Sequence, residues 1–114
     1  MQYLELKGMN FFAYHGVFPQ ERKVGNTYVV DLKLFADFCQ AMQSDRLEDT
    51  INYVSVYELI KEEMAIPSNL IEHVAARIIH RIKQTFSTIE KVEIRLAKKN
   101  PPFGGDICEV AVCL

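Results

Sequence analysis

Two stretches near the N-terminus alternate between apolar and polar residues, which is the period of a β-strand. The first runs from Tyr3 to Phe12, and the second covers residues 30–36. Their apolar positions are Leu4, Leu6, Val30, Leu32, Leu34 and Ala36. One face of each predicted strand should therefore be dry and the other wetter. The residues between the two strands, from Tyr14-His15-Gly16 to Gly25-Asn26, are expected to form a loop.

The period changes to that of a helix in the middle of the chain. One helix is predicted from Ser55 to about Ala65, and Ser55 and Glu58 have the spacing of a capping box. A stronger helix is predicted from Leu70 to about Phe86, after a break at Pro67-Ser68-Asn69. The apolar stripe of this second helix consists of Ile71, Val74, Ala75, Ile78, Ile79 and Ile82.

Strand periodicity returns over residues 92–96, and a last strand is predicted over residues 107–113, after the turn-forming segment 101–105. The order of elements is therefore ββααββ, and the predicted fold class is α+β. Two hairpins that flank a helix pair indicate a four-stranded, largely antiparallel sheet with both helices on one face.

The second face of this sheet has no element left to cover it. We place Phe11, Val29 and Phe35 on that face. Exposed apolar side chains and unpaired strand edges both favour association with another chain. The pattern therefore predicts a homo-oligomer whose copies join sheet to sheet.

Length and composition narrow the class of protein. The 114 residues suffice for one domain, which we assign to residues 1–114. Hydrophobic residues make up 49% and charged residues 25%, a balance typical of globular rather than disordered chains. The net charge of −2 argues against a nucleic-acid partner. No apolar stretch approaches the length of a membrane span, and the N-terminus lacks the order of a signal peptide, so no membrane partner is expected.

The three cysteines, Cys39, Cys108 and Cys113, form no C-x-x-C pair, and their number is odd. A disulfide framework is therefore not expected, and a reducing cytoplasmic location fits best. Cys108 and Cys113 belong to an apolar C-terminal stretch, where we expect them to be buried as small apolar side chains.

Three common kinds of chemical site have no support in the sequence. His73 and His80 are two helical turns apart, about 10 Å, which is too far for shared ligation, so no metal site is predicted. Gly104-Gly105 lacks the surroundings of a phosphate-binding loop. There is no G-x-S-x-G motif, and no cysteine lies beside a plausible histidine in a loop.

The remaining candidates for chemistry are polar residues at the ends of the predicted elements: Glu21, Tyr53, Glu72, Lys98 and Lys99. Each has a purely structural interpretation as well. Glu72, for example, has the spacing to form a capping box with Asn69. Strand alternation places Lys98 and Lys99 on opposite faces, so that only one of them can enter a site.

Five segments at these positions carry a resemblance to a known family. They are Leu6-Lys7-Gly8-Met9 with Tyr14-His15-Gly16-Val17, then Glu21-Arg22-Lys23-Val24-Gly25-Asn26, Asp49-Thr50-Ile51-Asn52-Tyr53, Asn69-Leu70-Ile71-Glu72-His73-Val74-Ala75, and Lys98-Lys99-Asn100-Pro101-Pro102. Occurring in order and at matching spacing, they resemble the dihydroneopterin aldolases of folate biosynthesis over essentially the whole chain. The resemblance implies the tunnelling fold, a ββααββ unit whose copies join into a barrel.

The resemblance also implies an activity. The substrate would be a small-molecule pterin, 7,8-dihydroneopterin, and a retro-aldol cleavage would release 6-hydroxymethyl-7,8-dihydropterin and glycolaldehyde. Side-chain epimerisation would accompany it. No cofactor would be needed, because the protonated C=N bond of the dihydropterin can itself accept the electrons. The assembly implied is an octamer with active sites shared between subunits.

The family's functional residues carry over to six positions of this chain. Glu72 would hold the amino and ring N–H edge of the pterin, since a carboxylate matches two parallel donors. The backbone at Ile71 and Ile51 would take further ring contacts. Lys98, selected by the motif K-x-N-P-P, would be the general acid and base. Tyr53 would move protons near the reacting carbon, and Glu21 would hold the substrate side chain and Lys98.

Three alternatives to the aldolase remain open from the sequence. An epimerase of the same fold would act on dihydroneopterin triphosphate and would need basic residues at the mouth of the site, where Arg22 and Lys23 are candidates. A non-catalytic pterin-binding module would tolerate the loss of Lys98. A purely structural oligomer would have no affinity for pterins.

Overall fold

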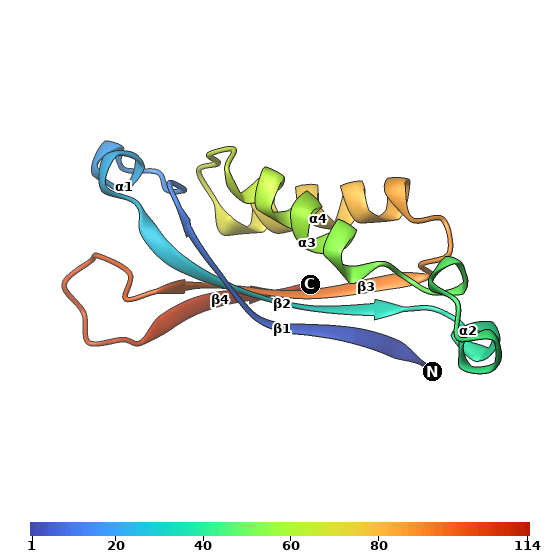
Figure 1. The fold of residues 1–114 in the computed structure, drawn as a ribbon. Coiled ribbons are helices and arrows are strands. Elements are labelled where there is room, and N and C mark those ends of the chain that lie inside the picture. Colours follow the sequence, from blue (N-terminus) through green and yellow to red (C-terminus); the bar gives the residue numbers. More distant parts are fainter.

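The computed structural model describes all 114 residues and is built around one antiparallel sheet (Figure 1). Its four strands lie in the order in which they occur in the chain: β1 (Tyr3–Ala13), β2 (Asn26–Phe35), β3 (Lys91–Lys99) and β4 (Glu109–Cys113). Every neighbouring pair is antiparallel, so β1 and β4 form the two edges. The predicted four-stranded α+β arrangement is confirmed.

Helices α3 (Tyr53–Met64) and α4 (Ile71–Thr85) cover one face of the sheet (Figure 1). The alternate residues of β2 and the apolar stripe of α4 meet in the core, where Val30, Leu34, Val74 and Ile78 are fully buried. The two helices run antiparallel. Residues near the end of α3 pair with the middle of α4, and the start of α3 lies beside the end of α4.

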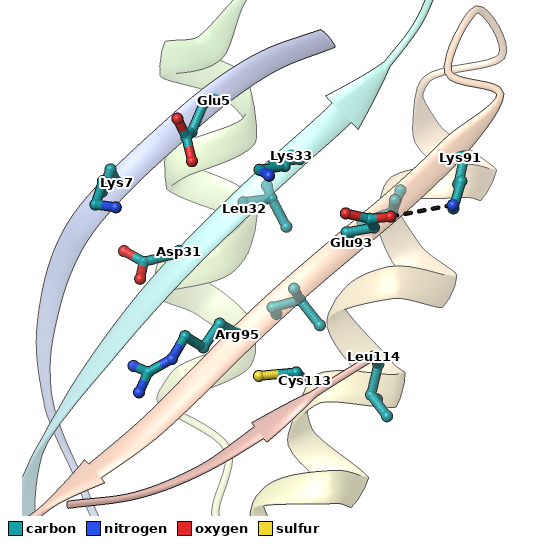
Figure 2. A pocket seen from close by; sticks show the side chains of 12 residues that line it. Glu5, Lys7, Asp31, Leu32, Lys33, Lys91, Glu93, Arg95, Cys113 and Leu114 are labelled. Carbon is teal, nitrogen blue, oxygen red and sulfur yellow. Dashed lines mark ion pairs between the residues drawn. The ribbon is translucent and has the colours of Figure 1, made fainter. Parts of the chain in front are cut away.

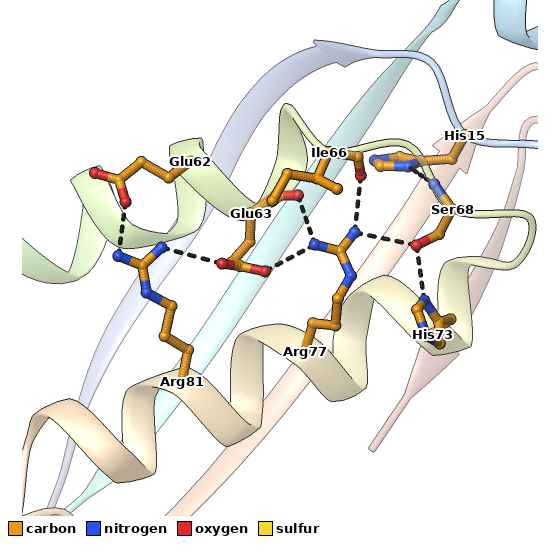
Figure 3. Close-up of polar contacts among 8 residues, drawn as sticks. All are labelled: His15, Glu62, Glu63, Ile66, Ser68, His73, Arg77 and Arg81. Atoms are coloured by element: carbon orange, nitrogen blue, oxygen red, sulfur yellow. Dashed lines mark hydrogen bonds and ion pairs between the residues drawn. The ribbon is translucent and has the colours of Figure 1, made fainter.

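Glu63, near the end of α3, anchors the helix pair through two arginines of α4 (Figure 3). It accepts hydrogen bonds from Arg77 at 2.7 Å and from Arg81 at 3.0 Å. Arg77 also donates to the backbone carbonyls of Glu63 and Ile66, which lie where α3 ends. A carboxylate that is 9% exposed is stable in this place because each of its oxygens has a charged partner.

A bulge in β1 changes which side chains face the helices. The pairing with β2 shifts between Leu6 and Met9, at Gly8, whose φ is 72°. The Gly8 N–H donates to the Asp31 carboxylate at 2.7 Å instead of to the ladder. As a result Leu4 and Leu6 face the helices before the bulge, and Met9 and Phe11 do so after it.

The open face of the sheet is mainly charged, in contrast to the expectation from sequence. Its side chains include Glu5, Lys7, Asp31, Lys33, Lys91, Glu93 and Arg95 (Figure 2). Val29 and Phe35 lie half-buried on this face as expected, but Phe11 does not: it is buried on the helix side and stacks on Tyr57 with 5.5 Å between ring centroids. The prediction for Phe11 was wrong because the bulge reverses the alternation.

Several short elements and helix starts differ from the expectation. The stretch between β1 and β2 contains α1 (Pro19–Val24), and a second short helix, α2 (Cys39–Ser44), and a 3₁₀ turn, η1 (Leu47–Asp49), follow β2. Helix α3 begins at Tyr53 and is capped by the Asn52 side chain, which accepts from the Val54 N–H at 3.1 Å, so the Ser55–Glu58 capping box was wrong.

All three cysteines are free and exposed, in contrast to the predicted burial of Cys108 and Cys113.

None of the helices has the length and apolar character that crossing a lipid bilayer requires.

Candidate functional site

An ion pair between α1 and the end of β3 forms the centre of the candidate site. The Lys98 Nζ donates to Glu21 Oε1 at 2.9 Å, and both side chains are more than four-fifths buried. The two residues are 77 positions apart in the chain. They meet because α1 folds over the end of the sheet at which β3 finishes (Figure 1). A partly desolvated ammonium and carboxylate in direct contact can exchange and relay protons.

The turn before α1 brings Glu21 into place. Glu21 is the third residue of α1, and its other oxygen accepts from the Phe18 N–H at 3.2 Å. Burial by itself would raise the pKa of Glu21, but the hydrogen bonds from Lys98 and Phe18 outweigh it and hold the pKa below its ordinary value. Gly16, at φ 153°, lies against this carboxylate, and a Cβ there would overlap the Glu21 side chain.

A pocket of about 440 Å³ opens beside this pair and is lined by Glu21, His15, Asn26, Asn100 and Pro102, among others. It therefore combines residues of the first loop with residues of the loop that follows β3.

Lys98 and Lys99 lie on opposite faces of the sheet, as strand alternation predicts. Lys98 is opposite Tyr28 of β2, on the helix side, and pairs with Glu21. Lys99 pairs with Glu109 at 3.5 Å on the other side of β3. Of the two lysines, only Lys98 faces the candidate site.

Glu72 lies at the same end of the molecule, in the first turn of α4. It follows the buried Ile71 and is itself exposed. The alternative interpretation of Glu72, a capping box with Asn69, is not formed: α4 has Leu70 as its N-cap with no side-chain cap, and the Asn69 amide oxygen instead accepts from Arg22. The Glu72 carboxylate is therefore exposed without a capping role.

Tyr53 and Ile51 lie at the other end of the helix pair. Tyr53 is the first residue of α3 and is 61% exposed, whereas Ile51 is buried just before it. Because α3 and α4 are antiparallel, the 12 residues of α3 separate Tyr53 from the start of α4. At a rise of 1.5 Å per residue this is about 18 Å. Within one chain, the six sequence candidates thus form two groups: Glu21, Ile71, Glu72 and Lys98 at one end, and Ile51 and Tyr53 at the other.

His15 is a site residue to which the sequence interpretation assigned no role. It is 1% exposed, and its Nδ1 accepts from the Ser68 N–H at 3.1 Å. Burial, followed by the charges of Arg77 and Lys98, lowers its pKa to about 4, although the Met64 carbonyl acts in the opposite direction. The ring is therefore neutral at pH 7, with its proton on Nε2.

Because His15 is buried and neutral, the folded protein should lose stability in mild acid. The pKa of His15 is about 4 in the folded chain and has the ordinary histidine value of 6.5 in the unfolded chain, so the unfolded chain binds more protons between these two pH values. The free energy of unfolding should therefore be highest above pH 6.5 and fall as the pH decreases toward 4, by up to about 3 kcal/mol from this group. Urea unfolding of the wild type and of His15→Asn, at several pH values between 6.5 and 4, measures this decrease in the free energy of unfolding.

The difference between the two unfolding curves isolates His15 from the carboxylates, since these titrate in both proteins. An equal pH dependence in the two proteins would contradict the assignment of a neutral, buried ring.

The structure brings no three His, Cys, Asp and Glu side chains together in a cluster that could hold a metal ion.

Comparison with known proteins relates this geometry to a family. The family model described as dihydroneopterin aldolase matches residues 4–114. A dihydroneopterin aldolase of Staphylococcus epidermidis is 42% identical over 101 residues, which cover 88% of this chain and 84% of the relative. One from Bacillus subtilis is 35% identical over 113 residues, covering 98% and 94% respectively.

The fold has a solved counterpart. The crystal structure of the Escherichia coli dihydroneopterin aldolase in complex with neopterin superposes with a TM-score of 0.91, covering all of this chain and 97% of the other at 21% identity. The family model spans nearly every residue, and both sequence relatives exceed 30% identity over most of their length. The chain belongs to the dihydroneopterin aldolase family.

Proposed function

We propose that this protein cleaves 7,8-dihydroneopterin into 6-hydroxymethyl-7,8-dihydropterin and glycolaldehyde, a step of folate biosynthesis. The observation that carries the proposal is the Lys98–Glu21 pair, buried beside a pocket at the position where the family motif places its acid and base. The sequence relatives support it, since those of Staphylococcus epidermidis and Bacillus subtilis are dihydroneopterin aldolases. The protein is thus a lyase that acts on a small pterin.

The reaction needs positioning and proton transfer. A base takes the proton of the 2′-hydroxyl, the C1′–C2′ bond breaks, and glycolaldehyde leaves with a new C=O bond. The electron pair moves into the C=N bond of the dihydropterin ring, and C1′ then receives a proton. Lys98 has the position to deliver and remove these protons, and Glu21 orients its ammonium through the 2.9 Å hydrogen bond. Re-forming the bond on the opposite face gives the side-chain epimer.

The pterin ring is held by the start of α4. The exposed Glu72 carboxylate can accept two parallel hydrogen bonds from the amino group and the ring N–H, and the N-terminal end of a helix leaves backbone N–H groups free nearby. The backbone at Ile71 provides a further contact to the ring.

Tyr53 and Ile51 complete the site from a neighbouring subunit. They lie about 18 Å of helix away from Glu72 in their own chain, which exceeds the reach of one pterin ring. The exposed sheet edges and the exposed aromatic residues Phe12, Phe18, Tyr53 and Phe103 favour association. The proposed assembly is an octamer, and the free cysteines suit a cytoplasmic location.

The triphosphate epimerase is a weaker candidate on the structure. Of its two basic candidates, Arg22 is already engaged: it donates to the Gly16 carbonyl at 3.0 Å and to the Asn69 side chain. This leaves Lys23, which is exposed, as the one free cation of that pair. Binding of a triphosphate needs more charge than this.

Product analysis tests the proposed function directly. The protein is incubated with 7,8-dihydroneopterin, and glycolaldehyde is trapped and quantified. Release of glycolaldehyde in proportion to the hydroxymethyl product identifies the aldolase. An epimer without glycolaldehyde would indicate an epimerase, and binding without turnover would indicate a pterin-binding module. A parallel incubation with the triphosphate measures the preference between the two substrates.

Glu72→Gln should separate ring binding from any contribution of the carboxylate to the stability of α4. The change keeps the size of the side chain but turns one acceptor into a donor that faces the N–H groups of the pterin. We expect the affinity for neopterin to fall by about 30-fold or more, or roughly 2 kcal/mol, while Tm stays within a few degrees. Calorimetric titration and thermal unfolding measure the two effects. Unchanged affinity with a lower Tm would assign Glu72 to the helix alone.

A further inference from the structure

A two-way hydrogen-bond lock joins the turn after β1 to the connection between α3 and α4. The Ser68 N–H donates to His15 Nδ1 at 3.1 Å (Figure 3), and the Gly16 N–H donates to the Ser68 carbonyl at 2.9 Å. His15 and Ser68 are 1% and 6% exposed, so water does not compete for either bond. The lock therefore fixes two loops that are about 50 residues apart in the chain.

Packing alone does not account for a histidine here. The ring meets Tyr28 edge-on with 5.1 Å between centroids, a contact that phenylalanine also makes. The Nε2 atom is buried and makes no hydrogen bond of good geometry, although the Met64 carbonyl is near enough to raise the pKa of the ring. What distinguishes histidine from an apolar ring at this place is its Nδ1 acceptor.

Each of the two loops that the lock joins contacts one part of the proposed site. The turn after β1 is the first side of the lock, and the connection between α3 and α4 is the second side. On the first side, Gly16 lies against the Glu21 carboxylate, and its carbonyl accepts from Arg22 of α1 at 3.0 Å. The first side therefore holds α1 and, through Glu21, the position of Lys98.

On the second side, the Ser68 hydroxyl bonds the His73 ring at 2.7 Å and accepts from Arg77 at 3.1 Å (Figure 3). His73 is the residue after Glu72, so the second side holds the first turn of α4. Arg22 adds a second tie between the two sides through Asn69.

We propose that His15 is a positioning residue, which sets the separation between the ring-binding Glu72 and the Glu21–Lys98 pair through its bond to Ser68. The proposal rests on the proposed function of these three residues. His15 does not touch the reacting atoms in this scheme. It keeps the substrate side chain at the pair while the ring is held by α4.

The consequence is a split between ring binding and turnover. With the lock broken, the pterin ring is still held, because the Glu72 carboxylate and the Ile71 backbone both belong to the start of α4. The side chain of the substrate is then no longer held at Lys98. Catalysis and the extra affinity due to the substrate side chain should both decrease, whereas the affinity for the bare ring should not.

Two substitutions separate the acceptor from the ring. His15→Asn keeps an oxygen at the position of Nδ1 but loses most of the ring, and His15→Phe keeps the ring but loses the acceptor. Ile78→Val, in the fully buried middle of α4, is the control for lower stability without any change at the lock. For each protein, kcat, Tm and the dissociation constants of pterin and neopterin are measured. Neopterin is unreactive and carries the side chain, whereas pterin is the ring alone.

His15→Phe should lower kcat by 30-fold or more and remove most of the advantage of neopterin over pterin, with the affinity for pterin changed by less than threefold. His15→Asn, despite its greater loss of packing, should keep kcat within about fivefold of the wild type. If activity instead follows Tm through all three variants, or if His15→Phe is fully active, the proposal is wrong. The two binding constants test the lock even if the wild type releases no glycolaldehyde, an outcome that would overturn the proposed function and not the lock.

Discussion

Replacing Lys98 by alanine is expected to lower kcat by about 10²–10⁴-fold, the range that a positioned acid or base contributes. The ring of the substrate is held elsewhere, by the start of α4, so its affinity should change by much less. Glu21 loses its partner at 2.9 Å and keeps the Phe18 N–H, which leaves a partly buried carboxylate with one hydrogen bond. A modest loss of stability should therefore accompany the loss of rate. Steady-state kinetics with 7,8-dihydroneopterin and a neopterin titration measure the effects separately.

Lys99→Ala is the matched control, because it removes the same side chain one residue further along the same strand. Lys99 faces the other side of the sheet, where it pairs with Glu109 at 3.5 Å and is 38% exposed. An exposed pair of this kind contributes little to stability, so this variant should be close to the wild type in rate and Tm. A large loss of rate in Lys99→Ala, with Lys98→Ala active, would mean that the reaction takes place on the charged face of the sheet.

Two inactive variants should restore activity when their subunits are mixed. Tyr53→Ala and Glu72→Ala remove residues that lie at opposite ends of the antiparallel helix pair, so a site that needs both must take them from different chains. After joint dissociation and reassembly at equal amounts, random pairing leaves both residues intact at about one quarter of the interfaces. About a quarter of wild-type activity is therefore expected, from a starting level near zero.

The controls for this experiment are each variant dissociated and reassembled alone, with the mass of the assembly measured in every case. Mixed assemblies of the correct mass with no activity would place Tyr53 and Glu72 of one site in the same chain. The proposed sharing between subunits would then be wrong, whatever the copy number.

Much of the fold follows from local periodicity, and the largest error shows why some of it does not. The alternation of β2 and the stripe of α4 predicted the buried residues of both elements, since each keeps one period from end to end. In β1 the period is interrupted at Gly8, and counting inward positions from Leu4 and Leu6 placed Phe11 on the wrong face. An isolated glycine within a strand is the available signal for such a bulge.

The candidate site was predictable in its residue types and only partly in its arrangement. Helix α1, which carries Glu21, has six residues, too few for a helical period to emerge, although Pro19 at its start and an acid in its first turn are typical of a helix N-terminus. The pairing of Glu21 with Lys98 joins residues that are 77 positions apart in the chain and follows from no local pattern. His15 was missed because its role lies in one acceptor atom that meets a backbone N–H of a distant loop.

The bulge at Gly8 also determines where the chain can change in length. Between the pairs Leu6–Leu32 and Met9–Val30, β1 has two residues where β2 has one, so deleting Gly8 would close the bulge and leave a regular ladder with the same side chains facing the helices. Deleting Asn10 instead would make Met9 and Phe11 adjacent in the strand, so that one of the two would turn out to the charged face. A deletion within residues 101–107, which form no strand or helix and are mostly exposed, reverses no side chains. A deletion scan of the gene should therefore yield folded protein from this loop and from Gly8, but not from Asn10.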